Sequence, residues 1–351
     1  MNAMNNPYTL VFGQPPIEII HRTAQVERIV SEFNSPRPAN YINLITGVRG
    51  SGKTVFITQI ADTLKTKDNW IVVNLNPQRD MLVSLAAKLD SDKSLHKLFS
   101  EAQINLQAFG IGFSIKGVPP ISDIEEALKK MLESIKKQKK RVLVTIDEAT
   151  NSKEMRIFAS TYQIFLRERL PIFLIMTGLH KEIDRLRNAR GMTFLERAPR
   201  TVLLPLNQNQ IIENYMHTLQ VSQAEASILA QQTKGYSFAF QTIGYFVYEN
   251  RDNLSKALDD AKEYLYIFAY EKIWSELSAR DKQVTLAAAK VPSGEIIKMR
   301  NILGYSSNQF NPYRDRLLKA GILVSPRNGI LKFALPWFDE YAITRSEQEE
   351  Y

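Results

Sequence analysis

Short runs of consecutive apolar residues recur along the first part of the chain, separated by longer segments with helical periodicity. The runs span 41–46, 70–75, 141–146, 171–178 and 201–206. Uninterrupted runs of this length, rich in β-branched residues, are typical of strands buried on both faces of a parallel sheet. The intervening segments repeat apolar residues every three or four positions, as on one face of a helix. The pattern predicts an α/β domain with a parallel sheet over residues 1–206.

Two segments depart from this alternation. Residues 17–33 have the spacing of an amphipathic helix ahead of the first strand, and Pro15 and Pro16 exclude a helix immediately before it. Residues 104–115 alternate apolar and polar side chains and contain glycines. That pattern predicts a β-hairpin inserted between the second and third strands.

The rest of the chain is mainly helical. Residues 207–275 contain no strand pattern and predict an all-α domain. Residues 276–345 predict three helices and two short strands around Asn328 and Gly329, and Asn-Gly is the strongest short hairpin signal. Three helices and a hairpin make a winged helix-turn-helix. Residues 346–351 form an acidic tail.

Pro312 determines where the third of these helices is expected to begin. A helix capped by Ser307 would place the proline where a backbone donor is needed, at a cost of about 3 kcal/mol. A helix capped by Asn311 would place it at the tolerated first position. The sequence therefore favours the later start and a helix of about nine residues.

The residues after the first strand fit the phosphate-binding pattern G-x-x-x-x-G-K-S/T. Strand, glycine loop and helix is the context that this loop requires, because its amides turn toward a phosphate at the positive end of the helix dipole. Lys53 is expected to reach the β- and γ-phosphates, and the Thr54 hydroxyl to hold Mg²⁺. A turn that binds nothing would need neither side chain. The expected nucleotide-binding residues are Gly47, Arg49, Gly50, Ser51, Gly52, Lys53 and Thr54.

Two carboxylates, Asp147 and Glu148, end the third strand. Open α/β sheets bind ligands at the carboxyl ends of their strands, so both residues lie at the expected edge. Asp147 is predicted to hold the Mg²⁺ that Thr54 contacts, and Glu148 to polarise the water that attacks the γ-phosphate. This is the Walker B pattern. The alternative is that the two residues only cap the next helix.

Composition narrows the class of protein. Of 351 residues, 44% are hydrophobic and 23% are charged, as in soluble globular proteins, and no apolar run is long enough to span a membrane. Residues 1–10 lack the features of a signal peptide. Without cysteine there is neither a disulfide framework nor thiolate chemistry. A cytoplasmic protein without a membrane partner fits these observations best.

A formal net charge of +8 favours polyanionic partners. Most of it is located in residues 277–345, which contain eleven cationic and five acidic residues. Double-stranded DNA is the expected partner of this segment. The alternative is a winged helix that packs on the α/β domain or on another protein. Arg314, Lys319 and Arg327 are expected at phosphates, and Asn308, Gln309 and Tyr313 at base edges.

With both motifs in this order, residues 17–206 resemble the ATPase domain of the AAA+ and STAND superfamily, in particular the archaeal-type ATPases and the origin-recognition initiators. The resemblance implies an ASCE P-loop NTPase sheet with strand order 5-1-4-3-2 and with Walker A and Walker B on adjacent strands. It implies ATP or ADP with Mg²⁺ as cofactor. It also implies that residues 207–275 form the lid of these ATPases.

The resemblance also assigns roles to single residues. Thr177, at the end of the fourth strand, occupies the sensor 1 position between Walker B and the γ-phosphate. Arg197 and Arg200 precede the last strand, where assemblies of this family place an arginine finger; Arg197 is preferred, and either could instead form a surface salt bridge. Residues 17–33, which include Arg22, correspond to a segment that often lies over the adenine. The alternative is an arm packed on the sheet edge.

One segment of the expected lid departs from the family pattern. Ser237 stands where STAND ATPases have the proline of a Gly-x-Pro turn, and no sensor 2 arginine is present there. Lys234 is the nearby cation that could substitute for it.

These observations predict a Mg²⁺- and ATP-dependent ATPase, slow or stimulated by a partner, whose winged helix binds DNA. One alternative is a nucleotide-gated signalling switch of the STAND type, in which the winged helix packs on the ATPase core or on a protein partner. Another is a nucleotide-binding protein with negligible turnover. A homo-oligomer is compatible with each.

Overall fold

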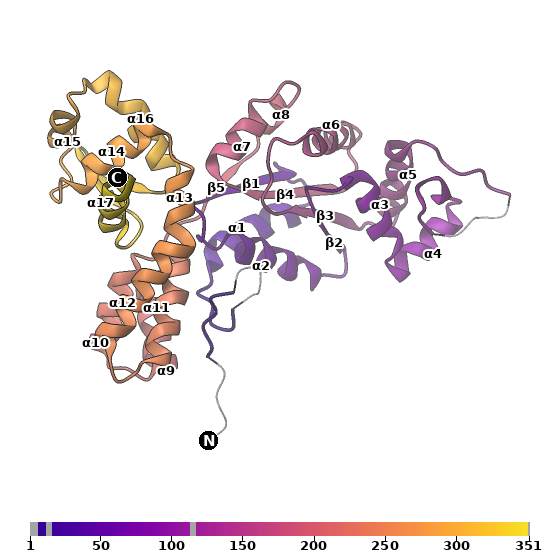
Figure 1. Ribbon diagram of the computed structural model, residues 1–351. Coiled ribbons are helices and arrows are strands. Elements are labelled where there is room, and N and C mark those ends of the chain that lie inside the picture. Colours follow the sequence, from indigo (N-terminus) through magenta and orange to yellow (C-terminus); the bar gives the residue numbers. More distant parts are fainter. Residues whose placement is uncertain (1–5, 12–15, 113–116, 350–351) are drawn as a thin grey trace. The chain divides into compact units, whose positions relative to one another are not determined.

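The computed structural model describes residues 6–11, 16–112 and 117–349. The chain divides into two compact units. The core unit contains residues 22–46 and 53–202. The C-terminal unit contains the described residues before 22, the loop 47–52 and the residues from 203 onward. Figure 1 labels the helices and strands of both units.

A five-stranded parallel sheet forms the centre of the core unit (Figure 1). Its strands are β1 (Ile42–Thr46), β2 (Trp70–Leu75), β3 (Arg141–Ile146), β4 (Ile172–Gly178) and β5 (Arg200–Val202). Their order across the sheet, β2-β3-β4-β1-β5, confirms the order that the resemblance implies. Walker A follows β1 and Walker B follows β3, and β4 lies between these strands. The expectation that the two motifs follow adjacent strands is therefore wrong.

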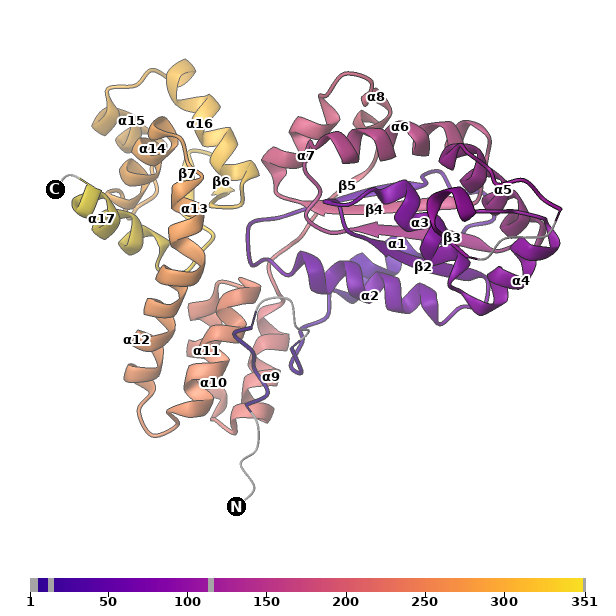
Figure 2. The same cartoon turned by 45° about the vertical axis from the view of Figure 1, so that its right-hand side comes forward.

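Helices cover both faces of this sheet because its central strands are apolar on both sides. Every residue of β1 and β4 is buried. The helices on one face are α1 (Thr23–Asn34) and α2 (Lys53–Lys65), and those on the other include α6 (Lys153–Arg167) and α7 (His180–Arg187), as Figure 2 shows. The remaining helices of the core unit are α3 (Met81–Asp90), α4 (Lys93–Glu101), α5 (Ile124–Lys137) and α8 (Thr193–Glu196).

Two predicted elements of the core region differ from the structure. The first helix begins at Thr23, so residues 17–22 are not helical. The predicted hairpin is wrong for residues 104–112, in which residues 107–109 form a single 3₁₀ turn. Gly110 and Gly112 have φ angles of 70° and 65°, which an extended strand does not allow. Ile104, Leu106 and Ile111 are instead buried in the core. Residues 113–116 of that prediction lie outside the described residues.

The segment that the resemblance assigns to the lid is helical and belongs to the C-terminal unit. Its helices are α9 (Gln208–Leu219), α10 (Gln223–Thr233), α11 (Ser237–Glu249) and α12 (Leu254–Leu265). The N-terminal segment packs against them, because Tyr8 is buried and its hydroxyl donates to Asn214 Oδ1 over 2.8 Å. The last lid helix continues through a π-helical turn, η2 (Tyr266–Tyr270), into α13 (Glu271–Ser275).

The C-terminal module, residues 276–349, contains three helices and an antiparallel hairpin, as predicted. They are α14 (Ala279–Ala289), α15 (Ile296–Leu303), α16 (Ser307–Lys319), β6 (Leu323–Arg327) and β7 (Ile330–Phe333). A further helix, α17 (Phe338–Glu349), follows.

The start of α16 corrects the interpretation of Pro312. The helix is capped by Ser306, which forms a capping box with Gln309, and Pro312 lies inside it. The capping box satisfies two backbone donors that a later start would leave outside the helix. Phe310 and Leu317 are also buried on the same face of the helix, so its first turn contributes to the core.

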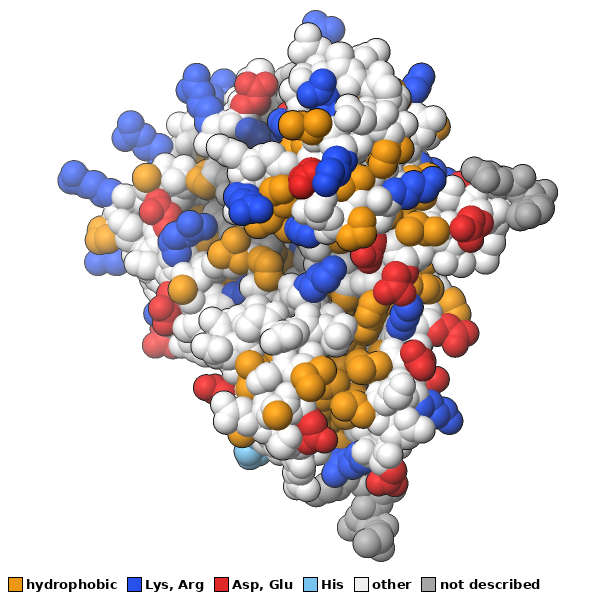
Figure 3. All heavy atoms as spheres, turned by 90° about the vertical axis from the view of Figure 1, so that its left-hand side faces the viewer, with side chains coloured by type: hydrophobic (Ala, Val, Ile, Leu, Met, Phe, Trp, Pro, Cys, Tyr) orange, Lys and Arg blue, Asp and Glu red, His pale blue; other side chains and the backbone are white. Residues whose placement is uncertain are grey.

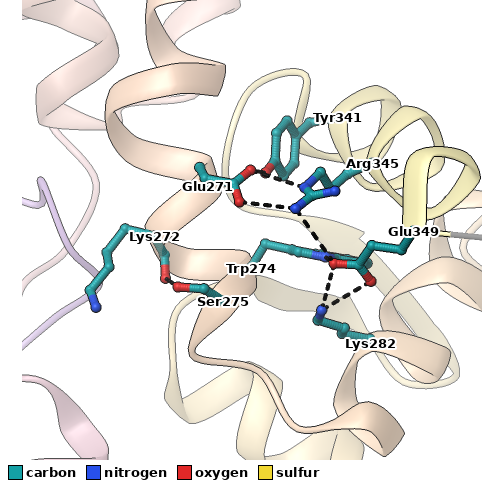
Figure 4. A network of polar contacts seen from close by, with 8 residues as sticks. All are labelled: Glu271, Lys272, Trp274, Ser275, Lys282, Tyr341, Arg345 and Glu349. Atoms are coloured by element: carbon teal, nitrogen blue, oxygen red, sulfur yellow. Dashed lines mark hydrogen bonds and ion pairs between the residues drawn. The ribbon is translucent and has the colours of Figure 1, made fainter.

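Helix α17 is anchored by its charged side chains (Figure 4). Glu271 of α13 accepts hydrogen bonds from Tyr341 and Arg345, over 2.6 and 3.1 Å. Glu349 accepts from Lys282 Nζ over 2.9 Å and from Trp274 Nε1 over 3.0 Å. These bonds lower the pKa of both carboxyl groups. The residues expected to form an acidic tail therefore continue a helix as far as Glu349.

In the described part of the chain, no helix is both long and apolar enough to cross a membrane.

Candidate nucleotide-binding site

Three side chains meet at the carboxyl edge of the core sheet. Thr54 lies in the first turn of α2, Asp147 follows β3, and Thr177 lies near the end of β4. Thr54 Oγ1 donates to Asp147 Oδ2 over 2.6 Å, and the Thr177 hydroxyl donates to Asp147 Oδ1. Each carboxylate oxygen of Asp147 therefore has one hydroxyl partner. The structure brings together three of the residues that the motifs and the resemblance predicted.

Glu148 adopts a left-handed backbone conformation directly after Asp147. Its φ angle is 56°, which is strained for a residue other than glycine. Its amide donates to Asp147 Oδ1 over 3.1 Å and to Thr177 Oγ1 over 3.2 Å, and these bonds hold the strained turn. The Glu148 side chain is exposed. Helix α6 is capped by Ser152, so the alternative that Asp147 and Glu148 only cap the next helix is wrong.

The loop 47–52 joins β1 to α2, which begins at Lys53. Gly50 and Gly52 have φ angles of 73° and 85°, which glycine adopts without strain. A side chain at Gly47 would place its Cβ 2.5 Å from Ser51 Oγ. The chain thus forms the strand, glycine loop and helix that the motif predicts, with the loop amides leading into the N-terminus of a 13-residue helix.

The two candidate arginine fingers differ in their surroundings. Arg200 is largely buried, bonds to His180 over 3.1 Å and pairs with Asp184. Arg197 ends α8, is exposed, and has no side-chain hydrogen bond or ion pair within the described residues. Of the two, Arg197 has the exposed guanidinium, and its role as an arginine finger stays a prediction.

Two further cations were expected near the nucleotide. Arg22 is the N-cap residue of α1, and burial lowers the pKa of its guanidinium to about 10, so it remains charged at neutral pH. Lys234 ends α10, and its Nζ donates to the carbonyls of Phe333 and Leu335 over 3.4 and 3.3 Å. Lys234 therefore contacts the C-terminal module, and the burial that results lowers its pKa.

The residues expected to contact DNA lie on α16 and the hairpin. Asn308, Lys319 and Arg327 are exposed. Arg314 is paired with its neighbour Asp315 over 2.8 Å. The Gln309 side chain accepts from Ser306 N over 2.8 Å in the capping box, so it is engaged within its own helix. Figure 3 shows Lys and Arg side chains spread among apolar and acidic ones on one face of the molecule.

Sequence patterns missed two interactions of this module and its lid. Arg316 pairs with Asp281 over 2.8 Å and lies over the Tyr313 ring, with its Cζ 4.7 Å from the ring centroid. Tyr236 donates a hydrogen bond to the carbonyl of Arg49, 187 residues away. No local pattern signals the ion pair of Arg316 with Asp281 or the hydrogen bond of Tyr236 to Arg49, because these partners are far apart along the chain.

A parallel sheet in this order, a glycine loop ahead of α2, and the pairing of Thr54 with Asp147 define the P-loop ATPase fold. Residues 22–166 match a family model described as an ATPase domain predominantly from Archaea. A second model, described as a domain of unknown function, matches residues 268–342. No curated protein matches the chain.

Solved structures share the fold over nearly the whole chain. The Walker-type ATPase PABY2304 of Pyrococcus abyssi is 15% identical with a TM-score of 0.64, and the match covers 93% of this chain and 96% of that one. The ORC2 protein of Aeropyrum pernix, in its ADPNP and ADP complexes, is 11% identical with a TM-score of 0.58, and the match covers 97% of each chain. The expected resemblance to archaeal ATPases and origin-recognition proteins is thus confirmed in the fold.

Proposed function

We propose that this protein binds ATP and ADP at residues 47–54 and hydrolyses ATP, slowly or when a partner stimulates it. The observation that carries the proposal is the Asp147 carboxylate, which has the Thr54 hydroxyl on one oxygen and the Thr177 hydroxyl on the other. This arrangement aligns the end of the Walker B strand with the first turn of the phosphate-binding helix. A turn without a ligand would not require it.

Mg²⁺ fits the donors that are present. The Thr54 hydroxyl and the Asp147 carboxylate are hard oxygen ligands 2.6 Å apart. Within the described residues, no group of three or more His, Cys, Asp or Glu side chains could form a site made of protein alone. Mg²⁺ is usually held by one or two protein oxygens together with phosphate and water. When bound, it would neutralise charge on the β- and γ-phosphates.

The chain's own residues would supply the rest of the chemistry. Lys53 would hold the β- and γ-phosphates, and Glu148 would orient the attacking water and accept its proton. Thr177 would keep Asp147 and the Glu148 backbone in place. Arg197 would reach the nucleotide of a neighbouring copy in a homo-oligomer.

Turnover and binding assays on matched variants test this proposal. We expect Lys53→Ala to lose nucleotide binding. Glu148→Gln should bind ATP normally and lose turnover by about a hundredfold or more, because it removes the general base. If wild-type protein binds ATP but releases phosphate no faster than Glu148→Gln, the protein is a nucleotide-binding protein without turnover. If wild-type protein does not bind ATP in the presence of Mg²⁺, the proposal fails altogether.

The C-terminal module would add binding of double-stranded DNA as a winged helix. The charge of residues 277–345, with eleven cationic and five acidic side chains, supports this. Arg314, Lys319 and Arg327 would contact phosphates, and Asn308 and Tyr313 base edges. Gel shifts with duplex DNA at several salt concentrations test it. Arg314→Ala with Lys319→Ala should weaken binding and reduce the salt dependence, whereas Lys53→Ala should bind DNA like the wild type.

A STAND-type switch is the second candidate, and two contacts favour it. Lys234 donates to carbonyls at the end of the hairpin, and Val48 of the nucleotide loop packs against the apolar cluster of the C-terminal module. Such contacts suit a winged helix that acts as a clasp. This candidate gains support if the gel shifts show no salt-dependent binding while nucleotide exchange changes the oligomeric state.

A further inference from the structure

We propose that Tyr236 and Ser237, at the start of α11, are positioning residues that hold the backbone of the phosphate-binding loop in its binding conformation. The inference rests on the proposed nucleotide binding. Both residues belong to the C-terminal unit, which also contains the loop 47–52. Three consecutive residues of the lid donate hydrogen bonds to three consecutive carbonyls of the loop. Tyr236 Oη donates to Arg49 O over 2.7 Å, and Ser237 Oγ donates to Ser51 O over 2.9 Å. Between them, the Phe238 amide donates to Gly50 O over 3.1 Å.

These bonds determine where the loop amides point. A carbonyl and the amide that follows it share one peptide plane and point in opposite directions. Fixing Arg49 O therefore turns the Gly50 amide away from α11, and fixing Ser51 O does the same for the Gly52 amide. Gly50 and Gly52 are two of the residues whose amides the motif assigns to phosphate. The lid thus orients these donors through the backbone of the loop.

The site is built around the Tyr236 hydroxyl. Tyr236 is 5% exposed, so water cannot readily replace it as the partner of Arg49 O. A side chain at Gly50 would place its Cβ 2.4 Å from Tyr236 Oη, so the close approach depends on glycine. Burial raises the pKa of the phenol far above neutrality, and the hydroxyl remains a donor at every physiological pH.

The lid residues themselves rest on a rigid support. Tyr236 and Phe238 belong to one buried cluster with Tyr270 and Trp274 of the η2–α13 segment and with Leu335. Tyr270 is fully buried and its hydroxyl donates to Pro336 O over 2.6 Å. The donors that hold the loop therefore have little freedom to follow it if it changes conformation.

The matched test compares two tyrosines. Tyr236→Phe removes the bond to the loop, and Tyr215→Phe removes an equivalent bond elsewhere in the lid, from a fully buried hydroxyl to Phe240 O over 2.8 Å. Affinity for a fluorescent ADP analogue, kcat and KM for ATP, and the melting temperature are measured for both full-length variants. We expect Tyr236→Phe to weaken ADP binding about three- to tenfold, the loss of roughly one hydrogen bond. Tyr215→Phe should lower the melting temperature about as much as Tyr236→Phe does, but it should leave ADP affinity unchanged.

Ser237 provides an independent variant. Ser237→Ala should weaken ADP binding to a similar degree, and Ser237→Thr, which keeps a hydroxyl, should restore it. The positioning role is overturned if wild-type protein binds ADP and both Tyr236→Phe and Ser237→Ala bind it equally well. It is also overturned if Tyr215→Phe weakens binding as much as Tyr236→Phe, because the effect is then one of lid stability. Failure of wild-type protein to bind ADP would instead reject the proposed function, and this inference with it.

Discussion

Thr177 is a fully buried threonine whose hydroxyl has two partners at the candidate site. It donates to Asp147 Oδ1 and accepts from the Glu148 amide. Thr177→Val keeps the shape of the side chain and removes both bonds. We expect kcat for ATP to fall about 10- to 100-fold, because hydrogen bonds to charged groups contribute about 1.5–3 kcal/mol. Nucleotide affinity should change little, since the loop is intact.

The control for this prediction is Thr201→Val. Thr201 is also buried in the sheet, but its hydroxyl contacts only Arg28 in the described structure, over 3.3 Å. This variant should retain wild-type turnover. Steady-state phosphate release measures both, and wild-type kcat in Thr177→Val would exclude a role for the hydroxyl in catalysis.

Gly244 in α11 is expected to behave unlike an ordinary helical glycine. Replacing glycine by alanine within a helix usually stabilises it by about 1 kcal/mol. Here a Cβ would lie 2.5 Å from the ring of Tyr8, which packs against the helix. Gly244→Ala should therefore lower the melting temperature. In a Tyr8→Ala background the same substitution should raise it, and a decrease in both backgrounds would contradict this explanation.

Sequence reasoning could propose site residues that lie close together along the chain. Asp147 and Glu148 are adjacent, and the loop leads directly into Lys53 and Thr54, so short motifs predict a role for each of them. It failed for Tyr236, whose partner Arg49 lies on a distant part of the chain. Hydroxyl-to-carbonyl bonds of this kind depend on tertiary structure and leave no periodic or compositional signal.

Among the elements, α16 provides a direct test of the proline interpretation. In an unbroken helix residue 312 would donate to the carbonyl of Asn308, and proline removes that donor. Pro312→Ala should raise the free energy of unfolding by about 1–3 kcal/mol. The increase is smaller than the full cost of a proline inside a helix, because alanine also raises the conformational entropy of the unfolded chain. Urea unfolding measures the change.

The counterpart of this variant is Ser306→Ala, which removes the cap of the same helix. It should lower stability by about 0.5–2 kcal/mol. If instead Pro312→Ala has no effect and Ser306→Ala is neutral, the helix is capped by Asn311 and begins at Pro312 in solution, as the sequence favoured.

The sequence predicted most elements and missed those in which two local signals compete. Continuous apolar runs identified the strands because both faces of this sheet are covered. In residues 104–112, alternation of apolar and polar residues suggested a strand, but Gly110 and Gly112 adopt left-handed conformations and the apolar side chains anchor an irregular segment. Periodicity does not reveal the φ angle of a glycine, so this segment could not be assigned from the pattern alone.

At the scale of the whole molecule, the compact units do not follow contiguous ranges. The division into 1–206, 207–275 and 276–345 expected from the sequence assigns the loop 47–52 to the ATPase domain. The structure groups that loop with the lid and the C-terminal module. The three bonds from α11 to the loop carbonyls are part of the physical reason. Domain boundaries inferred from composition cannot place the loop in the C-terminal unit, because contacts between segments distant along the chain determine that grouping.

Stability of the whole protein should depend on pH through the network of α13, α14 and α17 in Figure 4. Hydrogen bonds from Tyr341 and Arg345 lower the pKa of Glu271, and those from Lys282 and Trp274 lower the pKa of Glu349. A carboxyl group whose pKa is lower in the folded state stabilises the fold above its ordinary value of 4.5. That contribution is lost as the pH falls through the lower, folded value.

We expect Glu271→Gln and Glu349→Gln each to lower the melting temperature at pH 7 by about 1–3 °C. The effect is small because both side chains are partly exposed and solvent screens their charges. The difference from wild type should shrink as the pH falls below 4.5, and it should vanish once the pH lies below the lowered pKa of both carboxyl groups, where the wild-type side chains are also neutral. Glu347→Gln is the matched control, since Glu347 lies on the same helix, is exposed, and has no side-chain hydrogen bond or ion pair within the described residues. Melting curves between pH 3 and 7 measure the three variants, and a pH-independent loss in Glu271→Gln would show that the network acts through packing rather than charge.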